Sequence, residues 1–289
     1  MPLHMYQNKP PAHPLASIKH IIGIAAGKGG VGKSSVTVNL ALALRDKGYK
    51  VGVMDTDIYG PSIRRMMPED RLPAQNGEFI IPALCMGIEM VSMAYFRKEQ
   101  EAAVVRAPIA NGVITQFIKN VQWGSLDFLL IDFPPGTGDI QLTVGQQANL
   151  TGAIMVTTPQ EVAVMDVRKA INMFDQIKIP VIGIVENMSY YISPYSPDPI
   201  YLFGQGGGER LADEAGVPLL ERIPFDPELC RIADEGRSLF VLDPSHQKDI
   251  TRSFITLAQR LVEHVELLKT ENAEYLENFV LTWKEMGNG

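Results

Sequence analysis

The stretch GKGGVGKSS, residues 27–35, decides the fold because it contains a complete phosphate-binding loop. Its first eight residues fit the pattern G-x-x-x-x-G-K-[S/T]. The apolar run HIIGIAA (20–26) predicts a buried strand before the loop, and apolar positions with helical spacing predict a helix after it (36–44). A strand, this loop and a helix in that order are the context in which such a loop cradles nucleotide phosphates.

Each part of the loop has a predicted task. The glycines let backbone N–H groups turn inward, and the helix start adds the positive end of its dipole. Lys33 is expected to reach the β- and γ-phosphates, and the Ser34 hydroxyl to ligate Mg²⁺. The predicted nucleotide-binding residues of the loop are Gly27, Lys28, Gly29, Gly30, Val31, Gly32, Lys33, Ser34 and Ser35.

Three carboxylates follow predicted strands. Asp132 ends the apolar run LDFLLID, where a residue that orients Mg²⁺ through water belongs. Asp55 and Asp57 follow KVGVMD and point to the same side if the strand geometry persists. We assign Asp55 to Mg²⁺, and Asp57 and Asp132 to catalysis, with Asp57 orienting the attacking water. The alternative for Asp132 is a turn or helix cap. The alternative for Asp55 and Asp57 is a purely structural role, which is awkward for two carboxylates beside phosphates without a metal ion.

The segment PPGTGD follows Asp132 and is a candidate switch. Gly136 and Gly138 allow close approach of the backbone, so the segment could follow the γ-phosphate, with Gly136 contacting nucleotide. Asp139 is also a candidate cap for the helix that follows.

Strands and helices alternate along most of the chain, which predicts an α/β fold with a doubly wound, mostly parallel sheet. In such sheets ligands bind at the carboxyl ends of the strands. We expect a flexible leader (1–18), one domain (19–268) and a C-terminal helical extension (269–289). An apolar stripe predicts a helix across residues 250–268, and residues 272–286 predict a second, weaker helix.

Composition argues against several function classes. The net charge is −7 and no dense Lys/Arg run occurs, so we expect neither nucleic acid nor membrane as a partner. No apolar stretch approaches the roughly 20 residues of a membrane span. The leader has no signal-peptide core, and Cys85 and Cys230 are the only cysteines, so we expect a cytoplasmic protein. Both thiols lie in apolar contexts that predict buried, structural cysteines.

Lys28 is the second lysine of a loop that needs one. It cannot easily fold back onto its own phosphates while Lys33 fills that place. A second chain packed face to face could receive it, and it would then neutralise charge on the partner's γ-phosphate as a catalytic residue. The alternative is a solvated loop lysine.

The loop with its early lysine resembles the deviant Walker A motif of dimeric P-loop ATPases: the partition ATPases, the septum-positioning ATPases, the nitrogenase iron protein and the Mrp-type iron–sulfur cluster carriers. Five further stretches resemble the Mrp-type carriers in particular: MDTDIYGPSIRRM (54–66), LLIDFPPGTGDIQLT (129–143), TTPQEVAVMDVRKA (157–170), GIVENMSYY (183–191) and FGQGGGERLA (203–212). The resemblance implies a P-loop NTPase fold and a homodimer that encloses two Mg-ATP, with Lys28 acting in trans. It also implies that Asn187 contacts adenine and that residues 223–229 border the nucleotide.

The resemblance breaks where the family places C-P-x-C, two cysteines per chain that hold a bridging [4Fe–4S] cluster. Here the residues are Ser193-Pro194-Tyr195-Ser196. A serine hydroxyl stays protonated near neutral pH, whereas these clusters are held by thiolates. We therefore expect Ser193 and Ser196, the cluster-equivalent positions, to form a surface turn rather than a cluster site.

Three functions compete. The leading hypothesis is a homodimer that binds ATP, hydrolyses it slowly and serves iron–sulfur protein assembly, with client or assembly proteins as partners. The second is a nucleotide-gated module that has lost the cluster site and docks protein partners. The third, a positioning ATPase on DNA or membrane, is disfavoured by the acidic balance of the chain.

Overall fold

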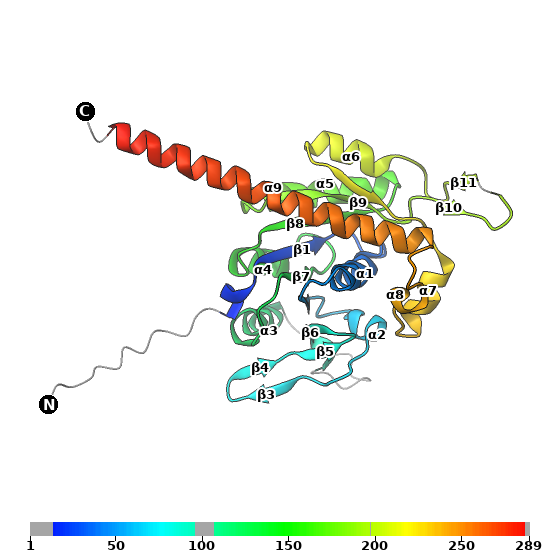
Figure 1. Ribbon diagram of the computed structural model, residues 1–289, viewed down its shortest axis with the longest axis horizontal. Helices are drawn as coiled ribbons and strands as arrows, with labels where there is room; N and C mark the ends of the chain where they lie inside the picture. The colour runs from blue at the N-terminus through cyan, green and yellow to red at the C-terminus, as the bar shows by residue number, and fades with distance from the viewer. Residues whose placement is uncertain (1–13, 96–106, 197, 287–289) are drawn as a thin grey trace.

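The computed structural model describes residues 14–95, 107–196 and 198–286, without the side chains of residues 107, 269 and 271–286. Most of the expected leader (1–13) and the last three residues of the expected extension lie outside this part. The described chain forms one central sheet with helices on both faces (Figure 1). This is the α/β, doubly wound arrangement that the sequence predicts.

The central sheet contains eight strands and is parallel except at one edge. Its order is β12-β9-β8-β1-β7-β2-β6-β5, and only β5 runs antiparallel to its neighbour. The strands are β1 (His20–Ala25), β2 (Val51–Asp55), β5 (Ala83–Cys85), β6 (Ile88–Ser92), β7 (Phe128–Asp132), β8 (Gly152–Thr157), β9 (Val181–Glu186) and β12 (Leu219–Arg222). Two hairpins lie outside the sheet: β3 (Ala74–Asn76) with β4 (Phe79–Ile81), and β10 (Tyr191–Ile192) with β11 (Pro199–Ile200).

Helices connect and cover the strands. They are α1 (Lys33–Asp46), α2 (Ile63–Met66), α3 (Ala107–Asn120), α4 (Asp139–Gln147), α5 (Glu161–Gln176), α6 (Gly207–Ala215), α7 (Pro227–Asp234), α8 (Leu239–Leu242) and α9 (Asp249–Met286), with short 3-10 turns η1 (Pro14–Ser17) and η2 (Met93–Tyr95). Within the described residues, none of the helices combines the length and apolar character needed to cross a bilayer.

Alternation along the strands places two apolar cores on opposite faces of the sheet. In β1, Ile22 and Ile24 belong to the core under α1 and α9, whereas Ile21 and Ala25 belong to the core under α3, α4 and α5. Successive side chains of a strand point to opposite faces, which accounts for this division. The carboxyl ends of β1, β7 and β2 are thereby fixed side by side at one edge.

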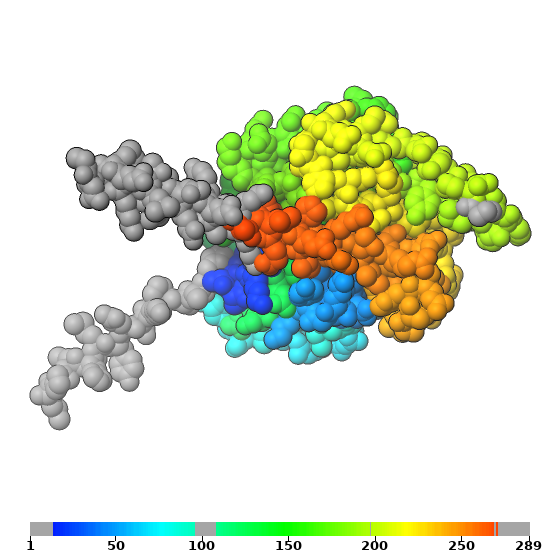
Figure 2. Space-filling model, turned by 45° about the horizontal axis from the view of Figure 1, so that its top comes forward, coloured from blue at the N-terminus to red at the C-terminus, as the bar shows by residue number. Residues whose placement is uncertain are grey.

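The C-terminal region is one helix, α9, and not two. No Gly or Pro occurs between Asp249 and Met286 to end it, so the helix continues. The predicted stripe is buried, with Phe254, Leu257 and Leu261 packed into the core under α1. In Figure 2 the orange part of α9 lies between the blue surface of the first strand–helix unit and the yellow surface of α6 and β12.

The expected leader is described only at its end. Residues 14–17 form η1, and Leu15 and Ile18 are buried in the core that contains α3. The division of the chain into leader, domain and extension stays a prediction.

Candidate functional site: the P-loop cavity

Two other parts of the chain pack closely against glycines of the phosphate-binding loop. Gly32 has φ 82°, and a Cβ there would lie 2.2 Å from the Nδ2 atom of Asn187. A Cβ on Gly27 would lie 2.1 Å from the backbone carbonyl carbon of Asp166 in α5. A Cβ atom is essentially never found within about 3 Å of a non-bonded heavy atom, so both positions favour glycine. Helix α5 and the residue after β9 therefore pack directly on the loop backbone.

Asn187 braces the loop directly. Its buried side chain donates a hydrogen bond from Nδ2 to the Val31 carbonyl at 2.9 Å, and its backbone N–H donates to the Thr157 carbonyl. The residue directly follows β9, so the sheet fixes its position. The observed contact of the Asn187 side chain is therefore with the backbone of the phosphate-binding loop. A contact with adenine stays a prediction.

Lys33 and Asp132 form a buried ion pair at the base of the loop. The Lys33 Nζ lies 2.6 Å from Oδ2 of Asp132, and the two side chains are 7% and 0% exposed. Ser34 Oγ donates to the same Oδ2 at 2.8 Å, and Thr37 Oγ1 donates to Oδ1 at 2.5 Å. The structure thus brings together three of the predicted site residues, Lys33, Ser34 and Asp132, and adds Thr37, which was not predicted. Their roles toward phosphates and Mg²⁺ stay predictions. The sequence feature that could have indicated Thr37 is its position one helical turn after Lys33, which places the two side chains on the same face of α1.

Asp55 lies beside Asp132 on the neighbouring strand, since the two are register partners of β2 and β7. It is buried and accepts hydrogen bonds from Ser92 Oγ at 2.8 Å and from the Asp57 N–H at 3.1 Å. Burial and, second, the negative charge of Asp132 raise the pKa of Asp55 to about 7. Ser92, at the end of β6, was not predicted.

Asp57 occupies a different environment from Asp55. Strand β2 ends at Asp55, so the alternation that would place both carboxylates on one side does not extend to Asp57. Asp57 instead accepts a hydrogen bond from the Gly60 N–H at 3.0 Å and lines the cavity beside the loop. Of the two, Asp57 is therefore the carboxylate that a ligand in this cavity can meet.

The cavity above the loop has a volume of about 460 Å³ and is enclosed by the loop, α2 and α7. Its lining consists of residues 28–35, Asp57, Ser62, Arg65, Met66, Pro135, Cys230, Ala233 and Asp234. Lys28 is half-buried on its wall, and within the described part of the chain its ammonium group has no ion-pair partner. Helix α7 contributes Cys230, Ala233 and Asp234 to the wall. None of residues 223–229, which precede and begin this helix, is among the lining residues, and their contact with nucleotide stays a prediction.

The two cysteines differ from each other. Cys85 is buried, as predicted, and burial raises the pKa of its thiol to about 11. Cys230 is exposed and lines the cavity, so the prediction of a buried cysteine is wrong there. Helix α7 is amphipathic and its buried position is Ile232, which turns Cys230 away from the core.

The segment after Asp132 is held by a glutamine. Gly136 has φ 94° and donates its N–H to the Ala26 carbonyl, which places it next to the phosphate-binding loop. The buried Gln141 donates to the Pro134 carbonyl at 2.8 Å and accepts from the Gly138 N–H at 2.7 Å. The cap of α4 is therefore provided by Gly138 and Gln141, and the prediction that Asp139 caps this helix is wrong. Asp139 is instead the first residue of α4.

The hairpin of β10 and β11 carries the two serines. Ser193 Oγ accepts the Tyr195 N–H at 3.2 Å, and Ser196 Oγ accepts the Asp198 N–H at 3.2 Å. These are turn hydrogen bonds, and Tyr195 between the serines is 97% exposed. Neither cysteine of the chain is on this hairpin, and among the described residues no group of three His, Cys, Asp or Glu side chains could hold a metal ion. Ser193 and Ser196 therefore do not fit a [4Fe–4S] cluster.

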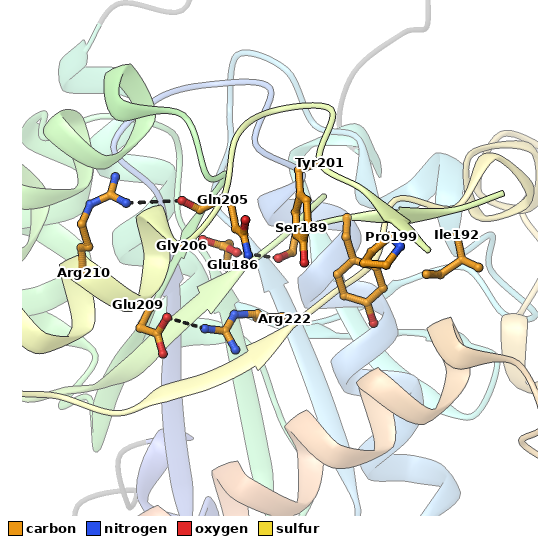
Figure 3. A pocket seen from close by; sticks show the side chains of 11 residues that line it. Glu186, Ser189, Ile192, Pro199, Tyr201, Gln205, Gly206, Glu209, Arg210 and Arg222 are labelled. Carbon is orange, nitrogen blue, oxygen red and sulfur yellow. Dashed lines mark hydrogen bonds and ion pairs between the residues drawn. The ribbon is translucent and has the colours of Figure 1, made fainter. Parts of the chain in front are cut away.

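A second cavity, of about 590 Å³, lies between this hairpin and α6 (Figure 3). The buried Glu186 carboxylate at its base accepts from Ser189 Oγ at 2.5 Å and from the Gly208 N–H at 2.6 Å. Figure 3 shows Arg222 paired with Glu209 at its rim, at 2.8 Å. Both oxygens of Glu186 have partners, so Glu186 ties the GQGGG turn to the end of β9 and is not an open ligand site.

Comparisons with known proteins agree with this geometry. The family model described as NUBPL iron-transfer P-loop NTPase, of the ParA group, matches residues 17–262. An iron–sulfur cluster carrier protein of Methanocaldococcus jannaschii is 46% identical over 256 residues, 87% of each chain, and one of Aquifex aeolicus is 40% identical over 252 residues, 86% of this chain and 69% of that protein. The nucleotide-binding protein of Archaeoglobus fulgidus, solved in complex with ADP, is 41% identical and superposes with a TM-score of 0.68 over 78% of this chain and 89% of that one. The chain therefore belongs to the NUBPL iron-transfer P-loop NTPase family.

Proposed function

We propose that the protein binds Mg-ATP in the P-loop cavity, hydrolyses it slowly, and works as a homodimer in iron–sulfur protein assembly. The observation that carries the proposal is the cluster of Lys33, Ser34 and Asp132 at the base of a glycine-rich loop that opens a helix. A lysine, a hydroxyl and an aspartate at such a helix start are the groups that hold nucleotide phosphates and Mg²⁺ in P-loop proteins.

The residues present fit a magnesium ion. Ser34 Oγ and the Asp132 carboxylate are hard oxygen donors, and Mg²⁺ in nucleotide sites is held by few protein oxygens together with phosphates. Both oxygens of Asp55 already have protein partners, so its assignment to Mg²⁺ stays a prediction. Mg²⁺, when bound, would neutralise charge on the phosphate oxygens. In this proposal Lys33 exchanges Asp132 for phosphate oxygens, while Asp132 keeps the hydrogen bond from Ser34.

Asp57 is the residue that we propose to orient the attacking water. It lines the cavity beside the loop, and one of its oxygens accepts a hydrogen bond from the Gly60 N–H. The loop that contains Gly136 contacts Ala26 through its backbone, so a shift at Asp132 can reach it. Residues 132–138 are therefore the segment that we propose to change with the nucleotide.

The homodimer is supported by what surrounds Lys28. Lys28 lies on the cavity wall without an ion-pair partner among the described residues. On α5, directly beside the backbone that packs on Gly27, Val162 and Met165 are 64% and 51% exposed. Exposed apolar side chains on the helix that packs on the phosphate-binding loop, together with an unpaired lysine in that loop, suit a second copy packed face to face, which would receive Lys28 at its γ-phosphate.

The iron–sulfur role rests on the relatives, whose names describe cluster carriers. Thiolate ligands are missing at Ser193 and Ser196, so the chain does not hold a cluster there in the family's manner. That observation favours the second candidate, a nucleotide-gated module that docks assembly or client proteins, with the exposed Tyr195 and Ile200 of the hairpin available for contact. We propose the cytoplasm as the compartment, since neither of the two cysteines is in a disulfide.

Binding of ATP tests the core of the proposal. Titration calorimetry with Mg-ATP and with Mg-ADP should give one site per chain, and addition of a non-hydrolysable ATP analogue should double the mass measured by light scattering. The matched control is Lys33→Gln, which keeps a hydrogen bond to Asp132 but removes the cation. Absence of nucleotide binding by the unmodified protein would overturn the proposal.

A further inference from the structure

The part of the cavity wall that α2 forms beside the phosphate-binding loop carries a cation to which the sequence analysis assigns no task. Arg65, on α2, lines the cavity and is exposed. Within the part of the chain that the structure describes, its guanidinium group makes no hydrogen bond or ion pair. The acidic residues on the same wall, Asp57 and Asp234, do not pair with it. An arginine that faces a cavity with all its donors free is suited to an anionic ligand.

The adjacent residue on α2, Arg64, has a structural role. Arg64 donates to both oxygens of Glu69, at 2.7 and 3.2 Å, and to the Ala94 carbonyl at 3.1 Å. Its guanidinium carbon also lies 4.9 Å from the centre of the Tyr95 ring. Arg64 therefore fastens α2 to the region after β6. Of the two neighbouring arginines, Arg64 therefore bonds to other parts of the protein, whereas Arg65 lines the cavity.

The backbone of Arg65 is nevertheless held in position by the packing of α2. Ile63 and Met67 on either side of it are buried, and the Met66 sulfur lies 3.7 Å from Ser35 Oγ, so α2 contacts the last residue of the phosphate-binding loop. A Cβ on Gly236 would lie 3.1 Å from the Arg65 carbonyl oxygen, which shows how closely the end of α7 packs on α2. The side chain is therefore held at the cavity without being used by the fold.

We propose that Arg65 is a nucleotide-positioning residue that binds a phosphate present in both ATP and ADP. The proposal deepens the proposed function and rests on it. The contact between Met66 and Ser35 places α2 beside the Ser35 end of the loop, whereas Lys33 and Ser34 act with Asp132 at its base. In this proposal the Arg65 guanidinium group contacts the phosphates from the wall that α2 and α7 form. Lys28 does not take part in this contact and can act on the partner subunit's nucleotide.

Titration calorimetry with Mg-ATP and with Mg-ADP tests the assignment. Arg65→Ala should weaken both nucleotides by a similar factor, about tenfold, the size expected for a charge-assisted hydrogen bond that stays partly in water. Arg65→Lys should recover part of the loss, since it keeps the charge but not the planar fork. The melting temperature of the nucleotide-free Arg65→Ala protein should equal that of the unmodified protein, because the side chain supports nothing in the fold.

The matched control is Lys47→Ala, which removes the same charge at the exposed far end of α1 and should leave both affinities within about twofold. Arg65→Ala binding within twofold of the unmodified protein would overturn the assignment. Loss of ATP affinity with ADP affinity unchanged would also overturn it, because Arg65 would then act on the γ-phosphate. If the unmodified protein itself bound neither nucleotide, the proposed function would be wrong. Failure of the proposed function is therefore distinguishable from failure of the Arg65 assignment, in which the unmodified protein still binds nucleotide.

Discussion

The Lys33 ammonium group lies 2.6 Å from the Asp132 carboxylate, and both side chains are buried at the base of the phosphate-binding loop. The residue expected to hold phosphates and the residue expected to orient Mg²⁺ are therefore partners of each other. Under the proposed function a nucleotide would compete with Asp132 for Lys33, and this competition would connect nucleotide binding to the loop at residues 132–138.

Removing the charge of Asp132 tests this pairing. Asp132→Asn should lower the free energy of unfolding by about 3 kcal/mol, because it leaves Lys33 buried without its counter-charge. The loss should shrink when ADP is added with EDTA, because phosphate oxygens then pair with Lys33. Chemical denaturation with and without ADP measures both quantities. An equal loss in the two conditions would show that Lys33 does not exchange Asp132 for phosphate.

Asp55 predicts a pH dependence of stability. Its pKa is raised from 3.8 to about 7 by burial and by Asp132, so the folded protein holds this proton more tightly than the unfolded chain. The resulting stabilisation is present at low pH and is lost as the pH rises from about 4 to about 7. In metal-free buffer, Asp55→Asn should therefore gain stability relative to the unmodified protein over that range. A constant difference between the two proteins across these pH values would contradict the raised pKa.

Cys230 can report on the cavity. It is exposed and lines the same cavity as the phosphate-binding loop, whereas Cys85 is buried and burial raises its pKa to about 11. A thiol reagent should modify Cys230 first, and Mg-ADP should slow this reaction at least severalfold. Mass spectrometry of the modified peptide, with Cys230→Ser as the control, follows it. Modification at the same rate with and without saturating nucleotide would place the ligand elsewhere.

The serines of the hairpin lead to a prediction about iron. Anaerobic reconstitution with iron and sulfide should leave the unmodified protein without a bound cluster, since hydroxyl groups replace thiolates at Ser193 and Ser196. The double variant Ser193→Cys/Ser196→Cys should bind iron and absorb visible light. Iron retained by the unmodified protein, counted per dimer, would restore direct cluster carriage and locate it outside the hairpin.

The sequence predicted the fold and the base of the site because both follow from local patterns. Strand–loop–helix order identified the phosphate-binding loop, and an aspartate at the end of an apolar strand identified Asp132. Thr37, Ser92 and Gln141 were missed because their roles depend on partners brought close only by the folded sheet. The same holds for Cys230, whose exposure depends on which face of α7 packs inward.

Lys28 is predicted to act in turnover and not in binding. Lys28→Ala should abolish hydrolysis while the affinity for ATP changes little, because Lys33 and the loop backbone still hold the phosphates. Steady-state phosphate release and calorimetry on the same preparation separate the two effects. Unchanged turnover would leave Lys28 a solvated loop lysine.

The most direct measurement of the central claim mixes two inactive proteins. Lys28→Ala cannot supply the cation to its partner, and Asp57→Asn cannot orient water in its own site, but each keeps what the other lacks. If Lys28 acts across a dimer, the mixed dimer contains one complete site, and hydrolysis should return on mixing, with up to half of the mixed dimer's sites active. If Lys28 acts within its own chain or the protein works as a monomer, both sites stay defective, and the mixture would remain as inactive as its components.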